Sequence, residues 1–83
     1  MLLPPEDFSF NPVSHLLSWE TIEGSEEYWI QFSTDPDSGY VDLYIGTNTE
    51  CPFPQPSGTY YVCGRTKSPD GWSKPGKPHE IDI

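Results

Sequence analysis

The chain has 83 residues, of which 34% are apolar, and its formal net charge is −9. A chain of this length forms one domain with one modest core, and none of its apolar runs approaches the roughly 18 residues that span a bilayer. Because neutralising phosphates requires Lys and Arg, the negative charge also disfavours nucleic-acid binding. We therefore predict a single domain over residues 1–83, of which residues 1–6 could extend as an N-terminal arm, and no membrane insertion.

The predicted elements are short strands. Pro is spread through the chain, which excludes long helices, and short alternating blocks are separated by turn signals such as residues 35–39. The alternation predicts seven strands, at residues 7–10, 15–20, 28–33, 40–45, 49–53, 59–67 and 79–83. Seven short strands with regular turns favour an all-β, antiparallel β-sandwich.

Side chains alternate along a strand, so each predicted strand has an inward and an outward face. The side chains predicted to face the core are Leu17, Trp19, Tyr28, Ile30, Phe32, Tyr60 and Val62. The fourth strand should place Val41, Leu43 and Ile45 on one side. The side chains predicted to point outward are Trp29, Gln31, Tyr44, Tyr61, Cys63, Arg65 and Lys67.

The segment 52–56 contains three prolines. Because Pro has no amide donor, this segment must lie at a sheet edge or leave the sheet. It could prevent a sheet edge from pairing with another sheet, or it could be a polyproline ligand for an aromatic groove. The first interpretation is favoured.

The sixth strand leads through a Pro-Asp-Gly turn to Trp72. Arg65 and Lys67 share one face of that strand, so both cations can stack on the indole. We expect the Arg65 guanidinium over the Trp72 ring, with Lys67 extending the stack.

The four cations of the chain, Arg65, Lys67, Lys74 and Lys77, lie in one C-terminal window, whereas residues 1–64 contain ten acids and no base. Such a distribution suits ordered docking against a neighbour. It is also what a soluble, self-repelling surface with a few local ion pairs would show.

Several motifs resemble the fibronectin type III domain in order and spacing. They are Leu17-Ser18-Trp19, Tyr28-Trp29-Ile30, Gly58-Thr59-Tyr60-Tyr61-Val62 and Gly71-Trp72-Ser73-Lys74-Pro75. The resemblance implies a core Trp at Trp19 and a corner-forming Tyr at Tyr60, or at Tyr61 if the register slips. Trp72 and Ser73 also resemble one half of the Trp-Ser motif of cytokine receptors, whose Trp stacks between Arg side chains. The family usually has a larger apolar residue at Gly64, and a neighbour such as Trp19 could fill that space.

The sequence shows no catalytic or metal-binding signature. Cys63, His15 and His79 have no spacing that suggests a nucleophile with its base, and residues 35–39 lack the Gly and Glu spacing of a calcium loop. We expect no enzyme activity, cofactor or metal. Cys51 and Cys63 could form a disulfide, since their number is even and the domain is small. Reduced thiols are favoured because no export signal is visible.

Three outward aromatic residues, Trp29, Tyr44 and Tyr61, should share one face if the strand order is that of a type III domain. Such residues are enriched at interfaces, could stack on sugar rings, or could simply stabilise the sheet as cross-strand pairs. The candidate binding residues are Trp29, Tyr44, Tyr61, Arg65, Lys67 and Trp72.

The leading hypothesis is a non-enzymatic structural or decorating subunit that binds other proteins in a larger particle. Type III and immunoglobulin-like modules recur on phage heads and tails, so the resemblance and the small size suggest a virion protein. The alternatives are a carbohydrate-binding module and an extracellular or cell-surface adhesion fragment. The N-terminal sequence shows no signal peptide, so in the adhesion case Met1 would not be native.

Overall fold

The computed structural model describes residues 3–5 and 7–83, and within these residues it has eight β-strands and no helix. The strands are β1 (Ser9–Asn11), β2 (Leu16–Ser18), β3 (Glu27–Ser33), β4 (Val41–Gly46), β5 (Glu50–Pro52), β6 (Thr59–Ser68), β7 (Gly71–Trp72) and β8 (His79–Asp82). Among the described residues there is no helix that could cross a membrane.

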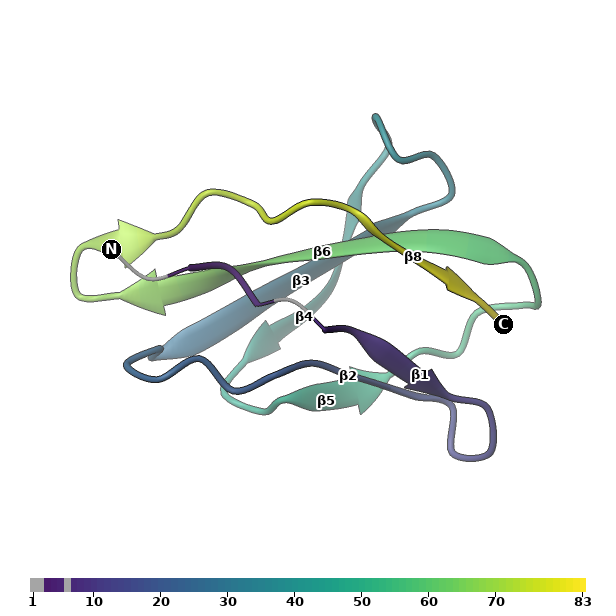
Figure 1. Cartoon of the computed structure of the whole chain (residues 1–83), viewed down its shortest axis with the longest axis horizontal. Helices are drawn as coiled ribbons and strands as arrows, with labels where there is room; N and C mark the ends of the chain where they lie inside the picture. The colour runs from purple at the N-terminus through teal and green to yellow at the C-terminus, as the bar shows by residue number, and fades with distance from the viewer. Residues whose placement is uncertain (1–2, 6) are drawn as a thin grey trace.

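The strands form two antiparallel sheets that face each other across the core (Figure 1). The smaller sheet has the order β1-β2-β5, and the larger has the order β4-β3-β6-β7. Strand β8 also pairs with β6, along residues 59–62, whereas β7 pairs with Lys67 and Ser68. The predicted all-β antiparallel sandwich is confirmed. It has eight strands because a short strand, β7, precedes the last predicted one.

The chain between β7 and β8 still follows β6. The Ser73 amide donates to the Thr66 carbonyl at 2.8 Å, and the Gly76 amide donates to the Gly64 carbonyl at 3.0 Å. Pro75 and Pro78 have no amide proton, so they cannot take part as donors, and regular pairing is interrupted there.

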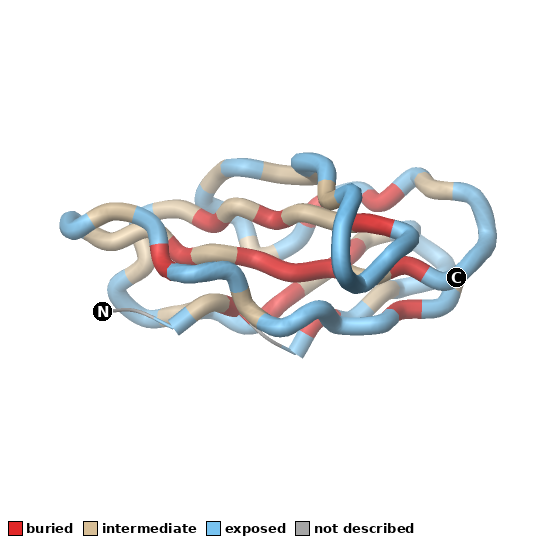
Figure 2. The backbone as a smooth tube through the Cα atoms, turned by 90° about the horizontal axis from the view of Figure 1, so that it is seen from above, coloured by how far each residue is buried: buried red, intermediate tan, exposed pale blue. Residues whose placement is uncertain are grey.

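The core lies between the two sheets and is built around Trp19, which follows β2. The Trp19 side chain is 5% exposed, and its ring lies 6.1 Å from Tyr28 and 5.8 Å from Tyr44 between centroids. Its indole nitrogen has no hydrogen-bond partner within the described residues, so packing holds this ring in place. Figure 2 shows buried positions gathered toward the middle of the molecule, with exposed loops around them.

The predicted inward phase is confirmed. All the side chains assigned to the core are buried or packed against it: Leu17, Trp19, Tyr28, Ile30, Phe32, Tyr60 and Val62. The Tyr60 hydroxyl donates to the Pro56 carbonyl at 2.7 Å, which is the corner interaction expected at this position.

One fully buried core residue was not predicted to face inward. Phe53 lies just after β5, in the Pro-rich segment, and packs edge-on against Phe32 and Tyr60 with centroids 5.3 Å away from each. Its amide donates to the His15 carbonyl at 2.9 Å. Strand β5 is an edge strand, as the prolines predict, but the segment then returns an aromatic side chain to the core.

The predicted phase of β4 is wrong at its C-terminal end. The register against β3 shifts between Ile30 and Gln31, so Leu43 is an extra residue on β4. As a result Tyr44 pairs with Ile30 and packs on Trp19, whereas Ile45 is displaced to the exposed side. The bulge explains why strict alternation fails here.

The N-terminal residues 3–5 lie against β6. Pro5 is fully buried, and the Thr66 hydroxyl donates to the Leu3 carbonyl at 2.9 Å. Of the predicted arm, Met1, Leu2 and Glu6 lie outside the described residues.

The space beside Gly64 is filled by residues other than Trp19, contrary to expectation. A Cβ at Gly64 would lie 2.7 Å from Pro5 Cγ and 2.8 Å from Ile30 Cδ1. Glycine is therefore required for the N-terminal segment to approach β6 closely.

We predict that Gly64→Ala destabilises the fold by about 1–3 kcal/mol, because the added methyl group overpacks a filled space. In a Pro5→Ala background the same substitution should cost less, since one of the two colliding groups is gone. Urea unfolding of the four chains of this double-mutant cycle measures the coupling. Equal costs in both backgrounds would show that Pro5 does not occupy the space beside Gly64.

Candidate functional site

The pairing of β3, β6 and β7 brings two Trp residues and two cations together on the outer face of the larger sheet. Trp29 on β3 pairs with Arg65 on β6, and Lys67 on β6 pairs with Trp72 on β7. We call these four residues, Trp29, Arg65, Lys67 and Trp72, the aromatic–cation cluster. The turn between β6 and β7 is short, with the Ser68 hydroxyl donating to the Gly71 carbonyl, so Trp72 returns directly beside Lys67.

Each cation of the cluster lies against an indole. The Arg65 guanidinium carbon is 4.8 Å from the Trp29 ring centroid, and Lys67 Nζ is 5.8 Å from the Trp72 centroid. The two indoles meet edge to face, with centroids 5.6 Å apart and planes inclined by 65°. The expected stack of Arg65 on Trp72 is therefore wrong. Trp29 is the direct cross-strand neighbour of Arg65, and β7 places Trp72 opposite the next cation along the strand.

Polar neighbours fix the Trp29 side of the cluster. The indole N–H of Trp29 donates to Asp42 Oδ1 at 2.6 Å, and Gln31 Nε2 donates to the same oxygen at 3.3 Å. Asp42 reaches this face because the bulge in β4 sets it opposite Gln31. Sequence reasoning missed Asp42, since its alternation pattern gave no sign of the bulge.

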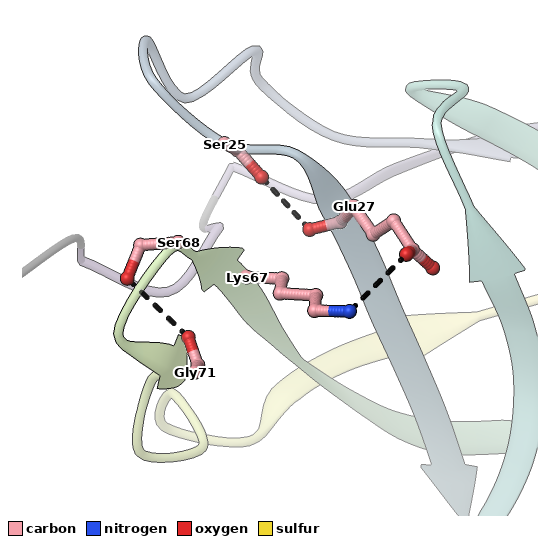
Figure 3. A network of polar contacts seen from close by, with 5 residues as sticks. All are labelled: Ser25, Glu27, Lys67, Ser68 and Gly71. Carbon is pink, nitrogen blue, oxygen red and sulfur yellow. Dashed lines mark hydrogen bonds and ion pairs between the residues drawn. The ribbon is translucent and has the colours of Figure 1, made fainter.

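An ion pair anchors the other end of the cluster (Figure 3). Lys67 Nζ lies 3.6 Å from Glu27 Oε1, across the pairing of β3 with β6. The Lys67 and Glu27 side chains are 40% and 37% exposed, so the pair contributes no more than about 1 kcal/mol. Its main effect is to position the lysine beside Trp72.

Arg65 differs from Lys67 in having no ion-pair partner within the described residues. Its Nε atom is buried without a hydrogen-bond acceptor, although the side chain as a whole is partly exposed. Stacking on Trp29 therefore orients a guanidinium whose charge stays available for an external anion. Trp72, which meets the other side of the cluster through Trp29, is 37% exposed.

The other two candidate residues lie apart from the cluster. Tyr44 packs into the core on Trp19, so its predicted outward position is wrong. Tyr61 is on the predicted strand face, but it pairs with Ser33, two outward positions along β6 from Arg65. Its hydroxyl donates to Glu80 at 3.3 Å, and desolvation together with this carboxylate raises the pKa of Tyr61.

The two cysteines are free and both are buried. Cys51 faces the core, paired in register with Leu17, whereas Cys63 lies on the opposite side of β6 from the core residue Val62. Burial raises the pKa of the Cys51 thiol to about 11. Burial also raises the pKa of Cys63, which the neighbouring Arg65 charge partly offsets.

Two open pockets lie away from the cluster. One, of about 200 Å³, is lined by Asp7, Phe8, Lys77, Pro78 and His79, and the other, of about 230 Å³, includes His15 and Gln55. Both are smaller than the roughly 300–1,000 Å³ of typical small-molecule sites. Among residues 3–5 and 7–83, no three or more His, Cys, Asp or Glu side chains are grouped as metal ligands.

Comparison with known proteins supports the architecture. No family model matches the chain, and no curated protein matches it. Among solved structures, the crystal structure of an Fn3-like protein from Clostridium thermocellum matches with a TM-score of 0.76 and 16% sequence identity. The match covers 95% of this chain and 90% of that chain. The fold is fibronectin type III-like. At this level of identity, the likeness of the two type III-like sandwiches extends to the fold alone.

We predict that Arg65→Ala lowers the free energy of unfolding by only about 0.5–1 kcal/mol, the value of an exposed cation–π contact. Lys77→Ala, a control cation with no ion pair in the described chain, should stay within about 0.5 kcal/mol of the parent. Thermal or urea unfolding measures both. A loss of several kcal/mol for Arg65→Ala would instead make the guanidinium a main support of the fold.

We predict that Cys51 is unreactive toward a thiolate-selective reagent at pH 8 until the protein unfolds. With a pKa of about 11, about one folded molecule in a thousand carries the Cys51 thiolate at this pH. The contribution of Cys51 protonation to stability is complete below about pH 8.5, the pKa of an unfolded thiol, and declines as the pH rises toward 11. Labelling of Cys63→Ala across a urea titration should follow unfolding. Rapid labelling of the folded protein would contradict the buried position of Cys51.

Proposed function

We propose that this protein is a non-enzymatic binding module, a structural or decorating subunit that docks onto another protein through the aromatic–cation cluster. The observation that carries the proposal is that one cluster holds the partly exposed Trp72 together with an Arg65 guanidinium that has no ion-pair partner in the described chain. Trp and Arg are the residue types most enriched among side chains that dominate binding energy at interfaces. A sheet face that holds both in fixed positions is suited to docking.

Electrostatics indicates the kind of surface that would dock. Residues 1–64, which we call the acidic body, contain ten Asp and Glu residues and no Lys or Arg, and all four cations lie within residues 65–77. A partner that offers carboxylates to Arg65 would be attracted to this window and oriented by it. Such a surface could belong to a different protein or to the acidic body of another copy of this chain.

The geometry favours a protein partner over a glycan. Sugar rings stack on open indole faces, but Arg65 lies against Trp29 and Lys67 against Trp72. Of the three aromatic residues predicted to share the outer face, Tyr44 is instead packed against the core. Carbohydrate binding therefore remains the alternative function, with Trp72 as its best-placed residue.

The assembly that we propose is a larger particle, with a phage virion as the example that small size and fold class suggest. Location in a virion would follow from that role. For the alternative adhesion function, the location would be extracellular or on the cell surface.

The proposal predicts that the chain co-purifies in fixed stoichiometry with particles or complexes isolated from its source. Trp72→Ala should weaken reassociation by about 30-fold or more, the loss of roughly 2 kcal/mol that defines a dominant interface residue. Raising the salt concentration should weaken it further, by screening Arg65. Val13→Ala, on an exposed side chain of the β1–β2 loop, is the matched control.

Free monosaccharides should not compete with this association. A solitary monomer that binds a glycan array through Trp72 would overturn the structural proposal in favour of the carbohydrate-binding one. Equal reassociation of Trp72→Ala and Val13→Ala would remove the cluster from the interface.

A further inference from the structure

The sheet edges of this protein are protected to very different degrees. Strands β1 and β5 have three residues each, β5 contains Pro52, and Pro12 follows β1. On the opposite edge of the larger sheet, β7 has two residues and β8 has four, with Pro78 directly before β8. Short strands and prolines are the usual means by which proteins prevent edge-to-edge pairing.

Strand β4 lacks these protections. It has six residues, without Pro or Lys, and it pairs only with β3. No backbone hydrogen bond joins the outer edge of Val41–Gly46 to any other element among the described residues. Val41 and Ile45 are each 52% exposed, although β-branched apolar residues are typical of paired strands.

We infer that the β4 edge is a docking site for an extended segment of another protein that adds a strand to the larger sheet. Main-chain hydrogen bonds to the free edge would hold such a segment, and its alternate side chains would contact Ile45 on the outer face and Val41 on the other. This edge adjoins the aromatic–cation cluster, since Ile45 pairs with Trp29, but the inference does not depend on the function proposed above.

Charge identifies the segment as basic. Asp35 and Asp37 lie in the loop that leads into β4, Asp42 is exposed within the strand, and Glu50 follows shortly after it. Acids thus lie before, within and after β4 along the chain, and no cation lies on β3, β4 or β5. A strand with Lys or Arg between β-branched residues complements this edge.

A second copy of the chain fits the edge poorly. In antiparallel pairing of β4 with its equivalent, the Val41 end of one strand lies beside the Gly46 end of the other. Each copy would then bring its own Asp35, Asp37 and Asp42 to the paired edges, with no cation on β3, β4 or β5 of either copy. Like charges placed opposite each other destabilise such a pair.

The bulge at Leu43 limits the length of the site. A bulge bends its strand and interrupts regular pairing, so the edge offers two short stretches, residues 41–42 and 44–46. Tyr44 stiffens the second stretch, because its ring packs on Trp19 and its hydroxyl accepts the Asn48 amide proton at 2.9 Å. A stiff edge loses little conformational freedom when a strand is added.

The test uses the full chain and two synthetic peptides, one of alternating Lys and Val and one in which Glu replaces Lys. NMR of the labelled protein should show that the Lys–Val peptide shifts the β4 amides and slows their hydrogen exchange. The Glu–Val peptide should not. Binding of the Lys–Val peptide should weaken about tenfold in Ile45→Lys, which places a like charge at the edge and removes an apolar contact.

Val13→Lys is the matched control, because it changes another exposed β-branched residue in the β1–β2 loop of the other sheet, and binding should stay within about twofold of the parent. Trp72→Ala should also leave peptide binding unchanged, which separates this inference from the cluster. Equal binding of both peptides, shifts away from β4, or an unaffected Ile45→Lys would overturn the inference. Concentration-dependent dimers paired through β4 in the absence of peptide would replace the basic segment by a second copy and likewise overturn it.

Discussion

The register between β3 and β6 is the constraint on which the rest of the structure depends. It sets Ile30 opposite Gly64 on the inner side and Trp29 opposite Arg65 on the outer side. The inner pair leaves space that Pro5 enters, and the outer pair starts the aromatic–cation cluster. Because side chains alternate, a slip of one residue would exchange the two faces, exposing Ile30 and burying a guanidinium. Core and surface are thus fixed by one alignment.

The pairing of β3 with β4 couples the aromatic–cation cluster to the edge of the larger sheet. Asp42 on β4 holds the Trp29 indole, and Trp29 in turn supports Arg65. Asp42 occupies that position only because Leu43 is inserted beside it. The bulge therefore affects both proposed binding regions. It places the Asp42 carboxylate that accepts the Trp29 hydrogen bond, and it divides the free edge of β4 into two stretches.

Alternation was a reliable guide where a strand is regular and central. It assigned Leu17, Ile30 and Val62 to the core because β2 pairs with its neighbours, and β3 with β6, without a register shift. It failed on β4, where one inserted residue reverses the phase beyond it, and residues 40–45 contain no Gly or Pro to signal the change. Local alternation cannot detect an insertion whose evidence lies in the partner strand.

The remaining misses concern residues whose positions depend on tertiary structure. Phe53 follows a proline and precedes another, so local pattern indicates an edge segment, yet it is fully buried. The contact of Arg65 with Trp29 joins residues far apart in sequence, whereas the expected partner Trp72 is close in sequence. Pairing on the sheet decided the contact, and sequence proximity did not.

Trp19 and the two surface indoles differ in a way that gives the protein an internal pair of optical reporters. Trp19 is surrounded by Phe8, Tyr28 and Tyr44 and its N–H has no acceptor in the described chain, so its fluorescence should resemble that of an indole in hydrocarbon. Trp29 donates to a carboxylate, and Trp72 lies partly in water beside an ammonium group, so both should emit at longer wavelengths. The short-wavelength part of one emission spectrum would thus follow the interior, and the long-wavelength part would follow occupancy of the outer face.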